Sequence, residues 1–190
     1  MTQPQTTPPR LLNLSGWMER SSANGPGARM VIWVQGCPFR CPGCQNSEDL
    51  EFRLNQVVTV EQTWQKFQEL PDLAGLSISG GEPFAQAVAL AELAAWVQES
   101  KKNVVCWTGY RLEQLKSGHI PGALDFLKHI DLLVDGLFVQ QEASNQVLRG
   151  SNNQKLHFLS DRLSEMDLLN IPRQEWIINS ETATYTGFPV

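Results

Sequence analysis

Apolar runs typical of buried strands alternate along the chain with segments whose apolar residues recur at helical spacing. The strand-like runs are rich in β-branched and aromatic residues, and several of them end at glycine or polar residues. From the N-terminus onward they cover residues 11–17, 29–35, 76–79, 104–107 and 132–134, with weaker candidates at 156–159 and 176–178. Alternation of this kind predicts a parallel sheet whose strands are connected by helical crossovers.

Two longer segments have the periodicity and the end signals of helices. Residues 60–70 predict a helix with Thr59 as N-cap and Gln62 three residues later, as in a capping box. Residues 84–100 predict a second helix from the spacing of their apolar positions. One or two shorter helices are expected within 111–128, where glycine and proline interrupt the pattern.

The predicted fold class is α/β, in one domain. A full eight-stranded barrel typically needs about 250 residues, whereas this chain has 190. We therefore expect a partial, open barrel of parallel strands wrapped by helices. Residues 1–10 are expected to form a flexible tail, 11–154 the core domain, and 155–190 a C-terminal extension that packs on the core or docks a partner.

Unusual polar or glycine-rich segments follow four of the predicted strands. They are a cysteine-containing loop at 36–48, Gly-Gly-Glu-Pro at 80–83, Thr-Gly-Tyr at 108–110 and Asp-Gly at 135–136. In parallel α/β folds the active site lies beyond the C-terminal ends of the strands. All four segments are therefore expected to meet on one face.

Composition excludes some functions. The chain carries 15 basic and 20 acidic residues, a formal net charge of −5, and no basic patch stands out, so binding to nucleic acid or to an anionic membrane is not expected. No apolar stretch is long enough to span a membrane. Residues 1–10 are polar and proline-rich without the apolar run of a secretory signal, which favours a cytoplasmic location.

Three of the four cysteines, Cys37, Cys41 and Cys44, lie within eight residues with the spacing C-x3-C-x2-C. Three thiolates on one loop can hold an iron–sulfur cluster and leave one iron open to a substrate. Structural zinc and uncommitted thiols are alternatives, but zinc prefers four ligands and the loop contains no histidine. Cys106 lies inside a predicted strand and is expected to be a small core residue.

The cysteine spacing after a first strand, followed by Gly-Gly-Glu-Pro after the next, resembles the radical S-adenosylmethionine (SAM) superfamily. Further motifs sharpen the resemblance to the activating proteins of anaerobic ribonucleotide reductase, which are glycyl-radical enzyme activases. These motifs are 24–29 (NGPGAR), 108–110 (TGY), 131–136 (DLLVDG) and 149–154 (RGSNNQ). The resemblance covers roughly residues 12–154.

The resemblance implies a chemistry and a set of partners. A [4Fe–4S] cluster on the three loop cysteines would be chelated at its open iron by SAM, and one electron from the reduced cluster would cleave the sulfonium bond. The resulting 5′-deoxyadenosyl radical would abstract hydrogen from a glycine of a partner, anaerobic ribonucleotide reductase. A flavodoxin or ferredoxin would supply the electron. The fold implied is the partial barrel of radical SAM enzymes.

The SAM contacts expected from the resemblance follow the strands. Gly80 and Gly81 lack Cβ atoms that would keep a ligand from the backbone, and Glu82 offers a carboxylate for the methionine ammonium group. Thr108, Gly109 and Asp135 are expected near SAM by their positions at strand ends. Ordinary turn chemistry is the alternative for each of these motifs.

Two departures from the family pattern affect the details. Gly43 stands where many superfamily members carry an aromatic beneath the adenine, and Asn24 stands where relatives often have Asp. Trp33 and Trp107 lie in strands and are expected in the core. The aromatic-tipped end 185–188 is expected either to insert into a partner groove or to form a mobile tail.

Three other functions remain open. The protein could be a radical SAM enzyme acting on a small molecule or peptide, although it has no second cysteine cluster. It could be an iron–sulfur electron carrier, for which Gly-Gly-Glu-Pro would be unnecessary. It could be a zinc-stabilised binding module, for which a three-thiol set is one ligand short.

Overall fold

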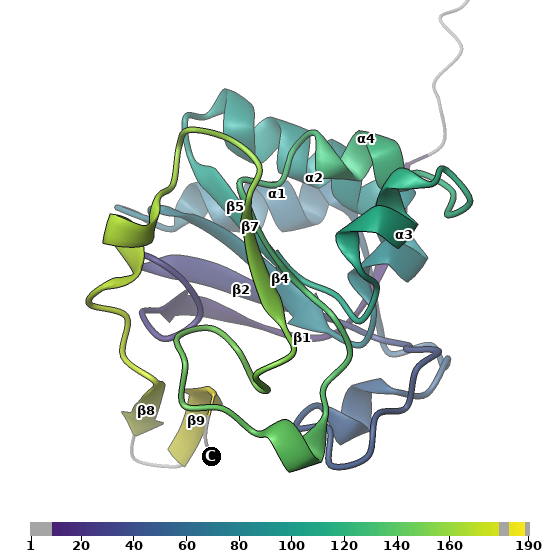
Figure 1. Ribbon diagram of the computed structural model, residues 1–190. Coiled ribbons are helices and arrows are strands. Elements are labelled where there is room, and N and C mark those ends of the chain that lie inside the picture. Colours follow the sequence, from purple (N-terminus) through teal and green to yellow (C-terminus); the bar gives the residue numbers. More distant parts are fainter. Residues whose placement is uncertain (1–8, 179–182, 189–190) are drawn as a thin grey trace, which may run out of the picture.

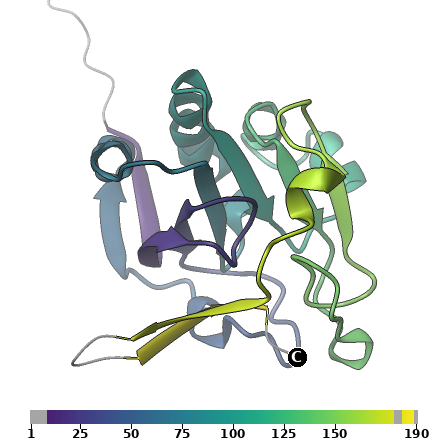
Figure 2. The same ribbon diagram turned by 90° about the vertical axis from the view of Figure 1, so that its left-hand side faces the viewer.

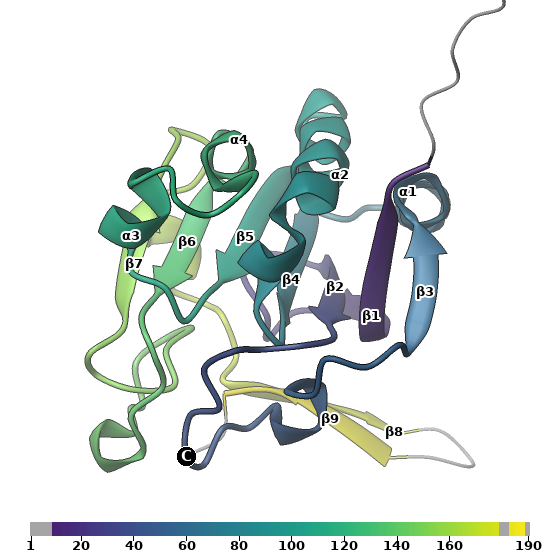
Figure 3. The ribbon, with the colours of Figure 1, turned by 90° about the vertical axis from the view of Figure 1, so that its right-hand side faces the viewer.

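The computed structural model describes residues 9–178 and 183–188. Its centre is a seven-stranded sheet with four α-helices on one face (Figures 1 and 3). In spatial order the strands are β3 (Gln56–Thr59), β1 (Leu11–Ser21), β2 (Arg29–Val34), β4 (Gly75–Gly80), β5 (Asn103–Trp107), β6 (Leu132–Asp135) and β7 (Lys155–Phe158). The α/β prediction is therefore confirmed.

The parallel pairing predicted for the whole sheet holds only for its centre. Strands β2, β4, β5 and β6 are mutually parallel, whereas β1, β3 and β7 pair antiparallel with their neighbours. The connection from β1 to β2, residues 22–28, is too short for the crossover that a parallel pair needs. Strand β3, Gln56–Thr59, was not predicted, because its short run merges with the start of the helix that follows.

The helices begin and end near the predicted positions. They are α1 (Val60–Glu69), α2 (Ala87–Glu99), α3 (Leu112–Lys116) and α4 (Ala123–Leu127), with 3-10 turns η1 (Ser47–Asp49), η2 (Pro83–Gln86), η3 (Gln140–Glu142) and η4 (Glu165–Leu168). Thr59 and Gln62 form the predicted capping box of α1, each side chain bonding the other's backbone N–H. No helix in the described part of the chain is long and apolar enough to cross a membrane.

Successive side chains of a strand point to opposite faces of the sheet, so the residues of each central strand contribute alternately to two cores. Val104 and Cys106 of β5 point into the core beneath the helices, whereas Val105 and Trp107 belong to a second core on the opposite face. Cys106 is fully buried on the helix side, as predicted. The second core is covered by the chain that follows β6, including Leu148.

The C-terminal segment contributes one strand to the main sheet and forms a separate hairpin. Residues 155–158 are the edge strand β7, and the chain then passes through η4 to a hairpin of β8 (Gln174–Ile178) and β9 (Ala183–Gly187), which lies beneath the main sheet in Figure 2. Of the tail predicted over 1–10, residues 1–8 lie outside the described residues. Of residues 185–188, expected either to insert into a partner groove or to form a mobile tail, 185–187 belong to strand β9.

Candidate functional site

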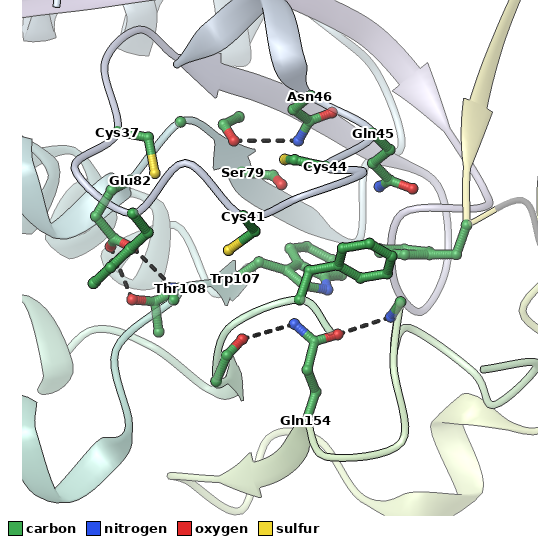
Figure 4. A pocket seen from close by; sticks show the side chains of 18 residues that line it. Cys37, Cys41, Cys44, Gln45, Asn46, Ser79, Glu82, Trp107, Thr108 and Gln154 are labelled. Atoms are coloured by element: carbon green, nitrogen blue, oxygen red, sulfur yellow. Dashed lines mark hydrogen bonds between the residues drawn. The ribbon is translucent and has the colours of Figure 1, made fainter. Parts of the chain in front are cut away.

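The C-terminal ends of the parallel strands meet at a cavity of about 110 Å³. The four segments picked out from the sequence converge on it, as predicted. Of the predicted site residues, eight line the cavity: Cys37, Cys41, Cys44, Gly80, Gly81, Glu82, Thr108 and Gly109. Figure 4 shows the three thiols and Glu82 around this space. Asp135 is the predicted site residue that does not line it.

The cysteine loop is fixed by backbone hydrogen bonds to the segment that follows it. Gly36 N–H donates to Asp49 O at 2.7 Å, and Cys37 N–H donates to Leu50 O at 3.0 Å. The Asn46 side chain donates to Gly80 O at 3.2 Å, which ties the loop to the end of β4. The thiols are thus presented by a closed, anchored loop.

Partial burial changes the acidity of these thiols. Cys37 is buried and Cys44 is half-buried, and loss of solvent raises the pKa of both, although backbone N–H groups nearby oppose the rise. All four cysteines are free. Metal ligation requires the thiolate, so binding a metal here would release protons.

The thiols are arranged around a space and do not meet at a point. In residues 9–178 and 183–188, no three histidine, cysteine or acidic side chains are grouped closely enough to hold a single metal ion. Yet Cys37, Cys41 and Cys44 all line one cavity. Three thiols that line one cavity are a donor set typical of iron–sulfur clusters.

The glycines of the Gly-Gly-Glu-Pro motif are required by chain packing. Gly80 has φ +100°, and a Cβ there would lie 2.5 Å from Val34 N. A Cβ on Gly81 would collide with Gly36 O. The end of β4 therefore packs against the end of β2 too closely for any side chain, which is a structural reason for both glycines besides access for a ligand.

Glu82 is the buried charged group of the site. Its Oε1 accepts from Phe84 N–H at 2.9 Å and from Thr108 Oγ1 at 2.8 Å, and its Oε2 accepts from Gly109 N–H at 2.8 Å. Only 1% of the residue is exposed, and burial raises the pKa of Glu82 to about 7, against the opposing effect of these three hydrogen bonds. A cationic ligand in the cavity would favour the ionised carboxylate.

Asp135 has different partners. Its Oδ2 accepts from Leu112 N–H at 2.7 Å and lies 2.9 Å from His157 Nε2. These contacts hold the start of α3 and strand β7 against the end of β6. The next residue, Gly136, lines the cavity in its place.

Gln154 organises the wall next to Gly136. Its side chain donates to Gly136 O at 2.9 Å and accepts from Gly150 N–H at 2.8 Å and Ser151 N–H at 3.2 Å. The dashed lines beside Gln154 in Figure 4 trace this bridge. The sequence placed Gln154 in a polar motif, but nothing in that motif indicated that its amide joins two loops.

Aromatic side chains form much of the remaining wall. Phe39, Trp107, Phe138 and Phe188 all line the cavity. Trp107 is buried, as predicted, but it also faces the cavity, and its ring stacks on Phe188 at a centroid distance of 5.5 Å. Phe188 therefore inserts into this chain's own cavity, and no local sequence signal relates it to Trp107.

The chain is similar in sequence to known proteins. Residues 23–157 match the model of a family described as a 4Fe-4S single cluster domain. The chain is 31% identical over 150 residues to the anaerobic ribonucleoside-triphosphate reductase-activating protein of Enterobacteria phage T4, a match covering 76% of this chain and 92% of the relative. Proteins of the same name from Escherichia coli K12 and Vibrio cholerae are 33% and 35% identical, over 72% and 70% of this chain and 92% and 90% of theirs.

Among solved structures, the crystal structure of QueE from Escherichia coli is similar over 52% of this chain and 52% of its own. The TM-score is 0.45 and the sequence identity is 15%.

Proposed function

The chain belongs to the 4Fe-4S single cluster domain family and to that of the anaerobic ribonucleoside-triphosphate reductase-activating proteins, and from this membership we propose its activity. It is a radical SAM activase that cleaves SAM reductively and installs a glycyl radical on anaerobic ribonucleotide reductase. The observation that best supports this activity is that the three loop thiols and the buried carboxylate of Glu82 line one cavity.

Cys37, Cys41 and Cys44 hold a [4Fe–4S] cluster in this proposal. The donor set fits, because thiolates are the usual ligands of such clusters and the loop offers one fewer than the four irons need. When bound, the cluster supplies the electron that cleaves the sulfonium C–S bond of SAM. The protein supplies position and shielding.

Glu82 orients the cationic end of SAM. Its carboxylate is preorganised by Thr108 and Gly109, so it needs no reorganisation when the ligand's ammonium group arrives. The aromatic wall excludes water from the space beside the thiols. Asp135 acts one step away: its carboxylate holds the backbone N–H of Leu112, while the next residue, Gly136, lines the cavity.

Further parts of the proposal concern the fold, the setting and the reductant. The sheet, with its parallel centre, is the partial β/α barrel of radical SAM enzymes. Residues 11–154 form the core, and 155–190 an extension that begins as the edge strand β7. A flavodoxin or ferredoxin supplies the electron, and free thiols in a tight group suit a reducing cytoplasm.

The first test compares two cysteines. Protein purified without oxygen is analysed for iron and sulfide, then incubated with SAM and dithionite, and 5′-deoxyadenosine is measured. Cys37→Ala is expected to reduce iron loading and 5′-deoxyadenosine to background. Cys106→Ala is the matched control, because Cys106 is equally a free cysteine but lies in the helix-side core; it is expected to retain both.

Three results would contradict the proposal: wild-type protein without iron, iron-loaded protein that makes no 5′-deoxyadenosine, or a Cys37→Ala variant that still makes it. The second result would favour an electron carrier. Activation is then measured by adding the reductase and recording the electron paramagnetic resonance signal of a glycyl radical.

A further inference from the structure

The C-terminal hairpin closes a cavity whose other residues come from the family-matched segment. Within the described part of the chain, strands β8 and β9 pair only with each other, and they follow the segment that matches the cluster-domain family. Phe188, immediately after β9, nevertheless lines the same cavity as Cys37, Cys41 and Cys44. A residue from outside the matched segment thus completes the site.

Phe188 is held by contacts on its backbone and on its ring. Its N–H donates to Arg173 O at 2.7 Å, and the Arg173 guanidinium donates to Phe188 O at 3.2 Å. Its ring stacks on Trp107 with an interplanar angle of 29°. Trp107 is fixed in turn, because its indole N–H donates to Leu148 O at 2.8 Å. The stacked pair presents apolar ring surface to the cavity.

A polar clasp attaches the hairpin to the last residue of β1 and to the loop that follows it. The Glu175 carboxylate accepts from Ser21 Oγ at 2.9 Å and from Ser22 N–H at 2.8 Å. The Asn24 side-chain amide donates to Thr186 Oγ1 at 2.7 Å and to Ser21 Oγ at 2.9 Å. An Asp at position 24 could not make these donations and would add a like charge near Glu175, so Asn24 suits a clasp that already contains a carboxylate.

The two sides of the cavity differ in chemistry. Figure 4 shows Cys37 and Glu82 on one side and Trp107 on the other. SAM has a charged amino-acid end and a flat purine end. The cysteine loop offers no ring of its own next to Cys44, since Gly43 has no side chain and a Cβ there would lie 2.8 Å from Gln140. Phe39, the aromatic residue that the cysteine loop contributes to the wall, packs edge-on against Tyr110, so the surface for a flat ring comes from elsewhere in the wall.

We propose that Phe188 is a positioning residue for SAM, and that with Trp107 it forms the apolar surface against which the purine ring packs. The inference rests on the proposed function. Stacking of a base on an aromatic ring contributes roughly 1–3 kcal/mol, so replacing the ring is expected to weaken SAM binding about 10-fold while leaving the reacting end in place.

The test compares ring replacement at two positions of the C-terminal hairpin, one within β9 and one immediately after it. Cluster-loaded Phe188→Leu is expected to bind SAM about 10-fold more weakly in equilibrium dialysis, with KM raised to the same degree and kcat within about threefold of wild type. Phe188→Trp is expected to restore the affinity. Tyr185→Leu is the control, because Tyr185 is exposed and lies outside this cavity; it is expected to bind SAM as wild type does.

Two fragments show which end of SAM is affected. In competition with SAM, 5′-deoxyadenosine should bind Phe188→Leu more weakly than wild type, whereas methionine should compete equally with both. Unchanged SAM affinity in Phe188→Leu, or an equal loss in Tyr185→Leu, overturns this inference alone. A wild-type protein that neither binds nor cleaves SAM overturns the proposed function, and this inference with it.

Discussion

Two walls of one cavity have different origins in the chain. The polar wall consists of segments that each follow a parallel strand, and it carries the thiols and Glu82. The apolar wall joins Trp107 to Phe188, which is 81 positions later and arrives on a hairpin outside the main sheet. The polar wall is determined by short motifs at strand ends, whereas the apolar wall depends on long-range packing.

The largest expected effect of a change at the polar wall, after loss of a cysteine, is at Glu82. Glu82→Gln keeps the side-chain shape but removes the negative charge that pairs with the ligand's ammonium group. Loss of a charge-assisted hydrogen bond costs roughly 1.5–3 kcal/mol. We expect kcat/KM for SAM cleavage to fall about 10- to 100-fold, measured as 5′-deoxyadenosine formation.

The control for this change is Glu99→Gln, an exposed residue at the end of α2. It should leave kcat/KM unchanged. If Glu82→Gln cleaved SAM at the wild-type rate, the carboxylate would have no part in orienting the substrate. The polar wall would then not act through the charge of Glu82.

A second prediction uses the pH dependence of stability in the cluster-free protein. The pKa of Glu82 is raised from 4.5 to about 7 in the folded state, so the native protein holds a proton that the unfolded chain has lost. Stability contributed by this group is therefore complete below about pH 4.5 and is lost as pH rises toward 7. Between pH 4.5 and 7, the contribution of Glu82 to the free energy of unfolding falls by about 3 kcal/mol in total.

Urea unfolding at several pH values, with reductant present, measures this contribution as the difference between wild type and Glu82→Gln. The free energy of unfolding should fall with pH more steeply in wild type than in the variant between pH 4.5 and 7. Parallel curves for the two proteins would show that Glu82 titrates normally and is more solvated than the structure indicates.

The smallest expected effect concerns the clasp that holds the apolar wall. Glu175→Ala removes the acceptor of two hydrogen bonds, from Ser21 Oγ and Ser22 N–H, and should reduce the free energy of unfolding by about 1 kcal/mol. Amide hydrogen exchange in β8 and β9 should accelerate, while exchange in β4 stays as in wild type. Equal exchange in the hairpin of both proteins would mean that packing of Phe188 suffices to hold it.

The same contrast explains how much of the molecule could be predicted from sequence. The sequence predicts that the cysteine loop, Glu82 and Thr108 meet on one face, and they line one cavity; it also predicts the capping box of α1, which forms. Each of these features depends on residues adjacent in the chain or at the end of a strand. Strands β1 and β7 pair antiparallel where the sequence predicts a parallel sheet, and for β1 the short connection to β2 contains the physical reason.

Other features could not be found without the fold. The inward position of Phe188 depends on the hairpin crossing beneath the sheet, and the bridge made by Gln154 depends on how two loops meet. The role of Gly80 and Gly81 is likewise set by the contact of β4 with β2. Asp135 was assigned to the cavity by its place at a strand end, but the direction of its side chain is fixed by Leu112 and His157.

The central claim is that three loop thiols hold four irons and leave one iron for SAM. Mössbauer spectroscopy of the protein loaded with ⁵⁷Fe under anoxia, recorded before and after addition of SAM, tests it directly. We predict a four-iron cluster in which one iron site changes its spectrum when SAM binds and the other three do not. A spectrum that SAM leaves unaltered, or a protein that takes up no iron, would contradict it.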